Sequence, residues 1–362
     1  GRLNADAIEA DLQPIRNVRL LNPTQMLSRF SFDRGNTAGL KIDDLDVDRY
    51  MIDGERLQVL VTARELDLPN IPNTSWQGTH LVSTRGCGMV MAPVGRVTES
   101  DRPDYQDLEV TRPELYFSPA IGGYGVTNTD VSESPCGDDG AYEGSAGIET
   151  GGVLRRAALA LAFLDYTLLG SGAINPDSQL LWIRSVEDRV EKLAPFLDYD
   201  GDPYPAIVDG EVVWVIDAYT STSRYPYAQR VGNEVQLSRS TGLSRNANYV
   251  RNSVKAVVDA YDGTVDFYVI DEEDPIIAAY RSAFPELFDD FADMPTELRE
   301  HLRYPEELFR VQTNMWARYH LENAEDFYNN NDAWEVSADP GTEGAQGQTQ
   351  TTDPDTGEVT ST

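Results

Sequence analysis

The sequence predicts an α+β fold in which antiparallel β-hairpins pack with a buried central helix and a helical C-terminal section. Asp-Gly pairs at 53–54, 209–210 and 262–263 each separate two alternating apolar runs, and this pattern is the strongest short-range signal of a hairpin. Residues 152–169 carry apolar side chains at helical spacing. Residues 275–337 combine helix-start signals with the same spacing.

The first part of the chain, residues 17–117, is predicted to be rich in β-strands, with a short helix over 4–12 before it. One hairpin is expected over 45–66 and a second strand pair over 79–99, because apolar and polar residues alternate there. The stretch 118–150 lacks periodicity and is rich in Gly, Pro, Ser and Asp, so a long surface loop is predicted.

Residues 151–197 are predicted to be helical. The first helix, 152–169, is apolar around most of its circumference, so it is expected to be buried on most sides. The second begins at Ser185, where Ser-Val-Glu-Asp forms a capping-box pattern. Two further hairpins are predicted over 204–271.

The C-terminal section, residues 275–337, is predicted to contain several helices. Asp274 and Thr296 are the expected N-caps of the first two. Pro305 opens the longest helix, and Trp334 is expected to dock on the core.

Charge and length describe the chain as a whole. One large domain is predicted over 1–337, followed by a disordered acidic tail over 338–362. With 29 basic and 61 acidic residues the net charge is −32, which excludes a nucleic-acid surface and disfavours anionic lipid headgroups. The most apolar run, 157–164, is shorter than the ~20 residues that a membrane span needs.

Cys87 and Cys136 are the two cysteines of the sequence. Two readings stay open. They form one disulfide that closes a loop of about 50 residues, or they are unrelated and one of them is buried. The disulfide is favoured if the chain lies outside the cytoplasm, where conditions are oxidising.

The sequence contains no catalytic motif of the serine-hydrolase, P-loop or HExxH type. Its three histidines are His80, His301 and His320. The last two lie on different predicted helices, so partly exposed helix histidines are expected rather than a shared metal site. Carboxylates are too abundant for the sequence to locate an acid/base pair.

The candidate metal site is Asp198-Tyr-Asp200-Gly-Asp202. Alternating aspartates with a glycine bend suit a hard cation, and calcium prefers six to eight oxygen ligands. The alternative is a turn whose aspartates cap backbone amides. No other cofactor is predicted.

The candidate partner-contact loop is 223–230, SRYPYAQR. Exposed Tyr and Arg are good contact residues, so a protein partner is expected to touch four of them: Arg224, Tyr225, Tyr227 and Arg230. The alternative is that the tyrosines close the end of the sheet.

Several longer strings are familiar together, including LDVDRYMIDG (45–54), GDPYPAIVDG (201–210), NYVRNSVKAVVDAYDGTV (248–265) and HLRYPEELFRVQ (301–312). They resemble uncharacterised protein family 0182, large multi-pass membrane proteins of bacteria, mainly actinobacteria. The resemblance covers nearly the whole chain to about Val336. It implies the soluble extracytoplasmic half of such a protein, at the cell membrane, with the membrane-embedded N-terminal part as a partner. It carries over no catalytic residues.

The chain departs from this family around Trp76 and His80. Where the family tends to have a second histidine and an aromatic residue, this chain has Arg85 and Cys87, so a site that relies on a histidine pair is in doubt. The function expected is binding of an envelope protein or glycan in assembly or transport, without nucleic acid. The alternative is a carboxylate-dependent envelope hydrolase, which requires two carboxyl groups with separated pKa values in one cleft.

Overall fold

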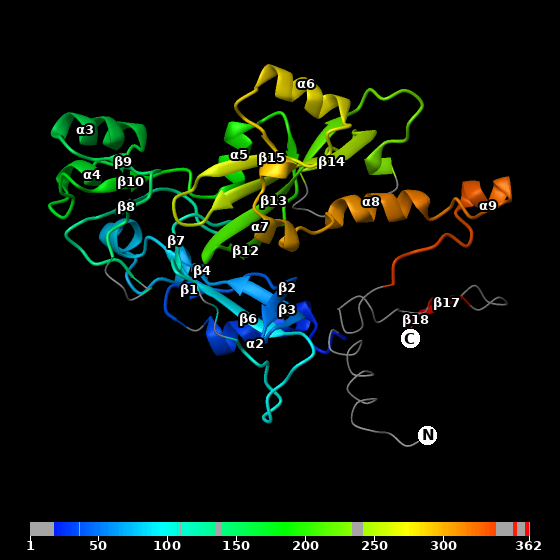
Figure 1. The fold of residues 1–362 in the computed structure, drawn as a ribbon, viewed down its shortest axis with the longest axis horizontal. Helices are drawn as coiled ribbons and strands as arrows, with labels where there is room; N and C mark the ends of the chain where they lie inside the picture. The colour runs from blue at the N-terminus through cyan, green and yellow to red at the C-terminus, as the bar shows by residue number, and fades with distance from the viewer. Residues whose placement is uncertain are drawn as a thin grey trace.

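The computed structural model describes residues 18–337, apart from 36, 107, 109, 135, 137–139 and 234–241, and also residues 350–352 and 359–361. The α+β class is confirmed, because antiparallel sheets and helices are both present. A central sheet lies between helices on one side and a smaller N-terminal sheet on the other (Figure 1). The predicted helix over 4–12 lies outside the described residues.

The N-terminal sheet has the order β2-β3-β6. The predicted hairpin is confirmed as β2 (Asp46–Ile52) and β3 (Glu55–Ala63), which turn through Asp53 and Gly54 at φ 53° and 78°. Positive φ at both positions is what the favoured two-residue hairpin turn requires. Helix α2 (Pro23–Arg34) covers this sheet through the buried Phe30.

The predicted strand pair over 79–99 is wrong. Residues Gly78–Val82 form a single π-helical turn, η3. The strands after it pair elsewhere, β6 (Met89–Pro93) with β3 and β5 (Gly86–Cys87) with β7 (Glu114–Leu115). A short pair, β1 (Leu40–Lys41) with β4 (Glu65–Leu66), and the 3₁₀ turn η2 (Leu68–Asn70) complete this region.

The central sheet contains both C-terminal hairpins that the sequence predicts. They are β12 (Tyr204–Val208) with β13 (Glu211–Thr222), and β14 (Tyr249–Asp259) with β15 (Val265–Val269). β13 pairs with β14 between them, so one long antiparallel surface forms. The edge strands β11 (Asp198–Tyr199) and β16 (Asp289–Asp290) extend it, β16 in parallel.

The expectation of a buried central helix is wrong. The segment forms α3 (Val153–Ala162) and α4 (Thr167–Gly170), and Ala160 is the one buried residue of α3. The inner side of α3 packs on a three-stranded sheet, β8 (Gly125–Thr127), β10 (Gln179–Leu181) and β9 (Ile148–Glu149). Because this sheet covers only one side of α3, the opposite apolar side remains in solvent. The predicted loop over 118–150 thus contains two short strands.

The remaining helices follow the predicted order. Ser185 caps α5 (Val186–Leu193) and Asp274 caps α6 (Pro275–Ala283), as the sequence predicts. Thr296 is instead the first residue of α7 (Thr296–His301), after Pro295. Helices α8 (Glu306–Trp316) and α9 (Ala324–Asn329) follow α7 along the chain. Two 3₁₀ turns, η4 (Val231–Asn233) and η5 (Phe291–Asp293), lie between the longer elements.

Trp334 does not dock on the core as expected. It is exposed and stacks on His320, with 4.0 Å between ring centroids. Of the predicted tail over 338–362, the structure describes one antiparallel pair, β17 (Gln350–Thr352) with β18 (Val359–Ser361), and the rest lies outside the described residues. The single-domain boundary at 337 stays a prediction. No helix among the described residues is long and apolar enough to cross a membrane.

Candidate functional site

Two pairs of polar side chains join the N-terminal sheet to the chain around α7. Alternation along β2 turns Asp46 and Asp48 inward, and both are buried. The Nδ1 atom of His301, at the end of α7, lies 2.8 Å from the Asp48 carboxylate. Arg303 donates through Nη1 to Asp46. The expectation that His301 is a partly exposed helix histidine is therefore wrong.

A third buried pair continues this network into the central sheet. Lys255 on β14 donates to the carboxylate of Asp217 on β13, and the two side chains are 2% and 7% exposed. Lys255 also donates to the backbone carbonyl oxygen of Arg303, 2.9 Å away. The three pairs thus connect β2, the α7–α8 segment and the central sheet. We call them the ionic network: Asp46–Arg303, Asp48–His301 and Asp217–Lys255.

An acidic pocket of about 240 Å³ lies beside this network. It is formed where the end of β3, the loop before β2, the start of α5 and the chain entering β12 meet. Six carboxylate side chains line it: Asp43, Asp44, Asp46, Glu65, Glu187 and Asp202. Trp214 and three prolines contribute apolar lining.

Several of these carboxyl groups hold their protons more tightly than usual. Burial raises the pKa of Asp46 to about 6, although the Arg303 guanidinium opposes the shift. Removal from water and the nearby carboxylates of Asp46 and Asp44 raise the pKa of Asp202 to about 7. Burial also raises the pKa values of Glu65 and Glu187. Such groups can exchange protons near neutral pH or attract a cation.

The structure does not bring the three predicted calcium ligands together. Asp198 accepts a hydrogen bond from Ser221, and the buried Asp200 accepts one from Tyr219, each at 2.5 Å. Asp202 alone lines the acidic pocket. Within the described ranges, no group of three or more acidic, histidine or cysteine residues is placed to hold a metal ion. Calcium stays a prediction.

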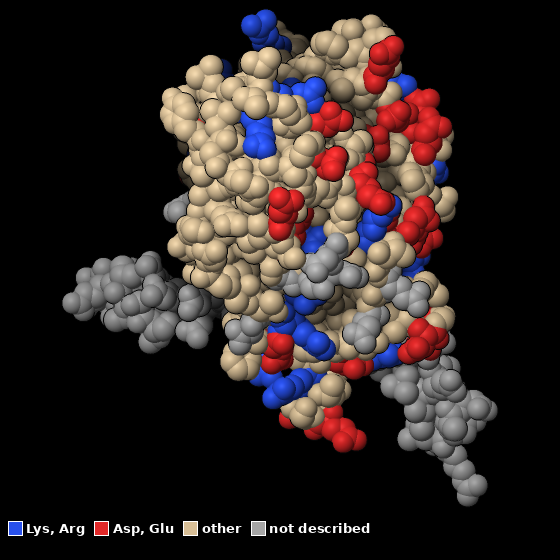
Figure 2. All heavy atoms as spheres, turned by 90° about the vertical axis from the view of Figure 1, so that its left-hand side faces the viewer, with Lys and Arg blue, Asp and Glu red and all other residues tan. Residues whose placement is uncertain are grey.

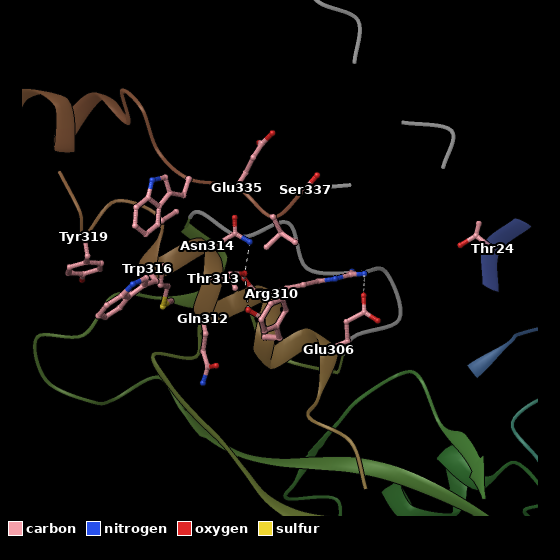
Figure 3. A pocket seen from close by; sticks show the side chains of 15 residues that line it. Thr24, Glu306, Arg310, Gln312, Thr313, Asn314, Trp316, Tyr319, Glu335 and Ser337 are labelled. Atoms are coloured by element: carbon pink, nitrogen blue, oxygen red, sulfur yellow. Dashed lines mark hydrogen bonds and ion pairs between the residues drawn. The ribbon is translucent and has the colours of Figure 1, made fainter. Parts of the chain in front are cut away.

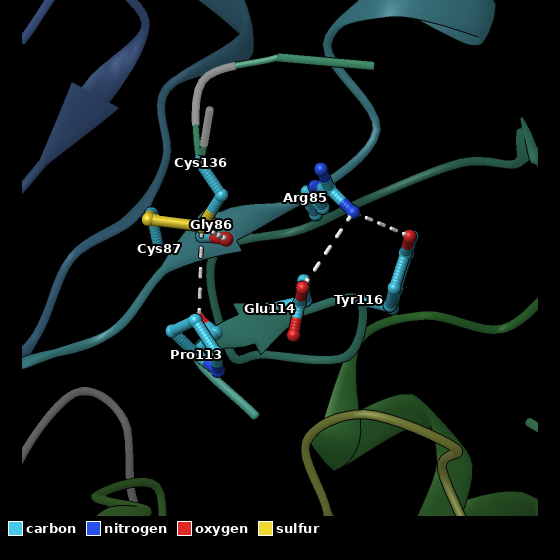
Figure 4. The surroundings of a disulfide bond; sticks show 7 residues. All are labelled: Arg85, Gly86, Cys87, Pro113, Glu114, Tyr116 and Cys136. Carbon is cyan, nitrogen blue, oxygen red and sulfur yellow. Dashed lines mark hydrogen bonds and ion pairs between the residues drawn. A yellow bond between two sulfur atoms is a disulfide. The ribbon is translucent and has the colours of Figure 1, made fainter. Parts of the chain in front are cut away.

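Cys87 and Cys136 form a disulfide, which resolves the two readings left open by the sequence (Figure 4). Beside it, the buried Arg85 donates to the Tyr116 hydroxyl at 3.0 Å and lies 4.0 Å from Glu114. His80 instead stacks on another ring, that of Tyr124, with centroids 4.3 Å apart. Arg85 therefore belongs to a buried polar cluster with Tyr116 and Glu114.

The predicted partner-contact residues all lie in solvent: Arg224, Tyr225, Tyr227 and Arg230. Tyr225 stacks on Tyr249, with centroids 5.6 Å apart. Tyr227 is fully exposed and adopts φ 59°, a left-handed conformation that is unfavourable for a bulky residue.

A groove of about 1390 Å³ follows the outer side of α8 (Figure 3). Its apolar lining includes Phe309, Trp316, Tyr319, Trp334 and Val336, all of which are exposed. Helical spacing predicts one apolar face with Leu308, Val311, Met315 and Tyr319; Leu308 and Val311 are buried, whereas Tyr319 is exposed and lines the groove. The exposed face was not predicted, and its signal is the spacing of Phe309 and Trp316, seven residues apart.

The fold and these sites describe an α+β module with an internal ionic network, one acidic pocket and an aromatic groove. The chain belongs to the uncharacterised protein family UPF0182, whose family model matches residues 1–355. No solved structure matches it.

The chain is similar to several curated UPF0182 proteins. One from Pelotomaculum thermopropionicum is 37% identical over 351 residues, covering 92% of this chain and 37% of the relative. One from Methanospirillum hungatei is 41% identical over 313 residues, covering 81% of this chain and 34% of the relative. One from Rhodococcus opacus is 37% identical over 378 residues, covering 92% of this chain and 38% of the relative. The chain thus spans little more than a third of their length. The relatives extend across bacteria and archaea, more widely than the resemblance implied.

Proposed function

We propose that this chain is an extracytoplasmic module of a larger membrane protein and that it binds a protein partner in assembly or transport. The binding surface is the aromatic end, which we define as the exposed rings of loop 223–230 and of the α8 groove: Tyr225, Tyr227, Phe309, Trp316, Tyr319 and Trp334. This concentration of exposed aromatic side chains is the observation that carries the proposal, because Trp and Tyr dominate the energetics of protein interfaces.

The two parts of the aromatic end are neighbours. Val231 and Leu243, which follow the loop, pack against Leu308 and Val311 on the inner side of α8. The loop and the helix are therefore held by one small core. A partner that covers the groove can also reach Tyr227.

The disulfide supports the extracytoplasmic location. Disulfides persist in oxidising compartments and are rare in the reducing cytoplasm. Cys87 and Cys136 are 49 residues apart in the sequence, and their bond ties Cys136 to β5. The share of the relatives' length that lies outside this chain leaves room for the membrane-embedded part.

The test is co-purification of the full-length protein from native membranes, followed by mass spectrometry. The variant is Tyr227→Ala combined with Trp316→Ala. The control is Phe32→Ala, which removes a similarly exposed aromatic ring on α2. We expect a partner that is retained by the control and weakened about thirtyfold or more by the double variant, as for two interface hot spots. Equal recovery from both variants, or recovery of a glycan in place of a protein, contradicts the proposal.

A second candidate function, a carboxylate-dependent envelope hydrolase, rests on the placement of Asp46 and Asp202 in one pocket; their pKa values, about 6 and about 7, lie close together, so a substrate would have to separate them. It predicts that the chain releases reducing sugar from cell-wall glycan with a bell-shaped pH profile. Asp202→Asn should abolish one limb of that profile. The absence of any sugar release by the unmodified chain removes this candidate.

A further inference from the structure

The outer side of α3 and α4 is an exposed apolar surface that the fold leaves uncovered. We call it the crest and define it by its exposed apolar side chains: Val153, Leu154, Leu161, Leu164, Tyr166 and Leu169. Leu154 is 89% exposed and Leu164 is 76% exposed, values typical of charged surface residues. Contiguous apolar patches of this kind mark surfaces that another molecule or a membrane covers.

The charge of the crest differs from that of the rest of the chain. Residues 151–164 contain Arg155 and Arg156 but no Asp or Glu, in a sequence with 61 acidic residues. Arg155 pairs with Glu149, which precedes this stretch, and Arg156 donates to the backbone carbonyl oxygen of Ile174. The first acid after them, Asp165, accepts hydrogen bonds from Trp76 and Tyr124, residues of the core cluster beneath α3. Figure 2 faces this end of the molecule, and acidic side chains gather along one side of the view beside a broad uncharged area.

The crest is a convex ridge with aromatic residues at its margin. It lies at the outer edge of the molecule, at the opposite end from α8 and α9 (Figure 1). Neither the acidic pocket nor the α8 groove is lined by a residue of α3 or α4. Trp182 is half exposed beside it and meets Phe163 edge to face, with centroids 5.3 Å apart. Aliphatic side chains bordered by Tyr, Trp and Arg are typical of segments that lie in a membrane interface.

We propose that the crest inserts into the headgroup region of a phospholipid bilayer, an inference that rests on the proposed membrane-protein function. Leu154, Leu161 and Leu164 enter the boundary between headgroups and acyl chains. Arg155, which pairs with Glu149 at 2.9 Å in the free chain, exchanges this partner for lipid phosphate, and Tyr166 and Trp182 lie at headgroup level. A second copy of the chain fits less well, because two bodies that each carry a net charge of −32 repel one another.

Sedimentation with vesicles of pure phosphatidylcholine tests the proposal. This lipid supplies phosphate without net charge, so the acidity of the chain does not oppose binding. The chain should sediment with the vesicles, and Leu154→Glu combined with Leu161→Glu should lower the partition coefficient about tenfold or more. Leu193→Glu is the control, because Leu193 is an exposed leucine on α5. Circular dichroism should show that all variants are folded, since each altered side chain is in solvent.

Three outcomes overturn the inference: no binding by the unmodified chain, equal binding by the crest variant and the control, or a dimer in light scattering that the crest variant abolishes. The last outcome would identify the crest as a contact between copies. If Tyr227→Ala weakens capture of the partner but the unmodified chain does not bind vesicles, only the crest proposal is refuted. If the chain binds vesicles as expected but no partner is recovered, only the partner proposal is refuted.

Discussion

Replacing Lys255 with Met should destabilise the chain strongly, because it leaves the carboxylate of Asp217 buried without its cation. Both side chains are almost completely buried. Removing one partner of a buried ion pair typically costs about 3–5 kcal/mol. Burial already raises the pKa of Asp217 against the opposing effect of Lys255, so without the lysine this carboxyl group should become protonated when the chain is folded.

Protonation sets an upper limit on the cost and makes it depend on pH. Holding a carboxyl group of ordinary pKa 3.8 protonated at pH 7 costs about 4.4 kcal/mol, and at pH 5 about 1.6 kcal/mol. When the pKa of a carboxyl group is higher in the folded chain than in the unfolded chain, the folded chain loses stability as pH rises between the two pKa values. The free energy of unfolding of Lys255→Met should therefore fall about 3–4 kcal/mol below the unmodified chain at pH 7, and by about half of that at pH 5.

Urea unfolding at both pH values measures this difference. Arg56→Met is the matched control, because Arg56 and Glu300 form an ion pair at 3.1 Å that is about half exposed. Its loss should cost less than about 1 kcal/mol. Lys255→Met combined with Asp217→Leu should recover most of the lost stability. A cost below about 1 kcal/mol at pH 7, or the same cost at both pH values, would refute the reasoning.

Three further predictions concern single sites. The raised pKa of Asp202, about 7, means that folding takes up a proton there, so stability should decline from pH 4 to pH 7; Asp202→Asn should flatten this decline in melting temperature. Loss of the disulfide through Cys87→Ser with Cys136→Ser should lower the free energy of unfolding by about 4 kcal/mol in urea titrations. Leu164 is exposed at φ 53°, so Leu164→Gly should raise that free energy by about 1 kcal/mol while weakening vesicle binding.

The sequence predicted the hairpins well because their information is local. An Asp-Gly turn fixes the register of the two strands that flank it, and β2–β3 and β12–β13 pair as expected. The strand pair over 79–99 failed because Gly86 and Gly88 do not turn one strand back on the next. Each neighbouring strand finds a partner elsewhere in the chain, which local alternation does not encode.

The ionic network escaped sequence analysis for a different reason. Asp46 and Asp48 look like the solvent-facing half of an alternating strand, and His301 looks like a helix surface residue. Each is buried because its partner comes from more than 250 positions away in the sequence. Asp202, a predicted metal ligand, lines the acidic pocket. The other carboxylates of this pocket come from the N-terminal sheet region and from α5, not from the neighbouring predicted ligands Asp198 and Asp200.

The misread helix α3 shows what an apolar pattern establishes. Apolar residues around the whole helix predict that most of its surface leaves water, and the sheet beneath α3 covers only one side. The same holds for α8, whose inner face packs on Leu243 while Phe309 and Trp316 stay exposed. In both helices the pattern leaves an exposed apolar surface for which we propose a binding partner: lipid for the crest and a protein for the aromatic end. The ionic network joins β2, the α7–α8 segment and the central sheet, whereas α3 packs on a separate small sheet, so the two proposed contacts involve different parts of the fold.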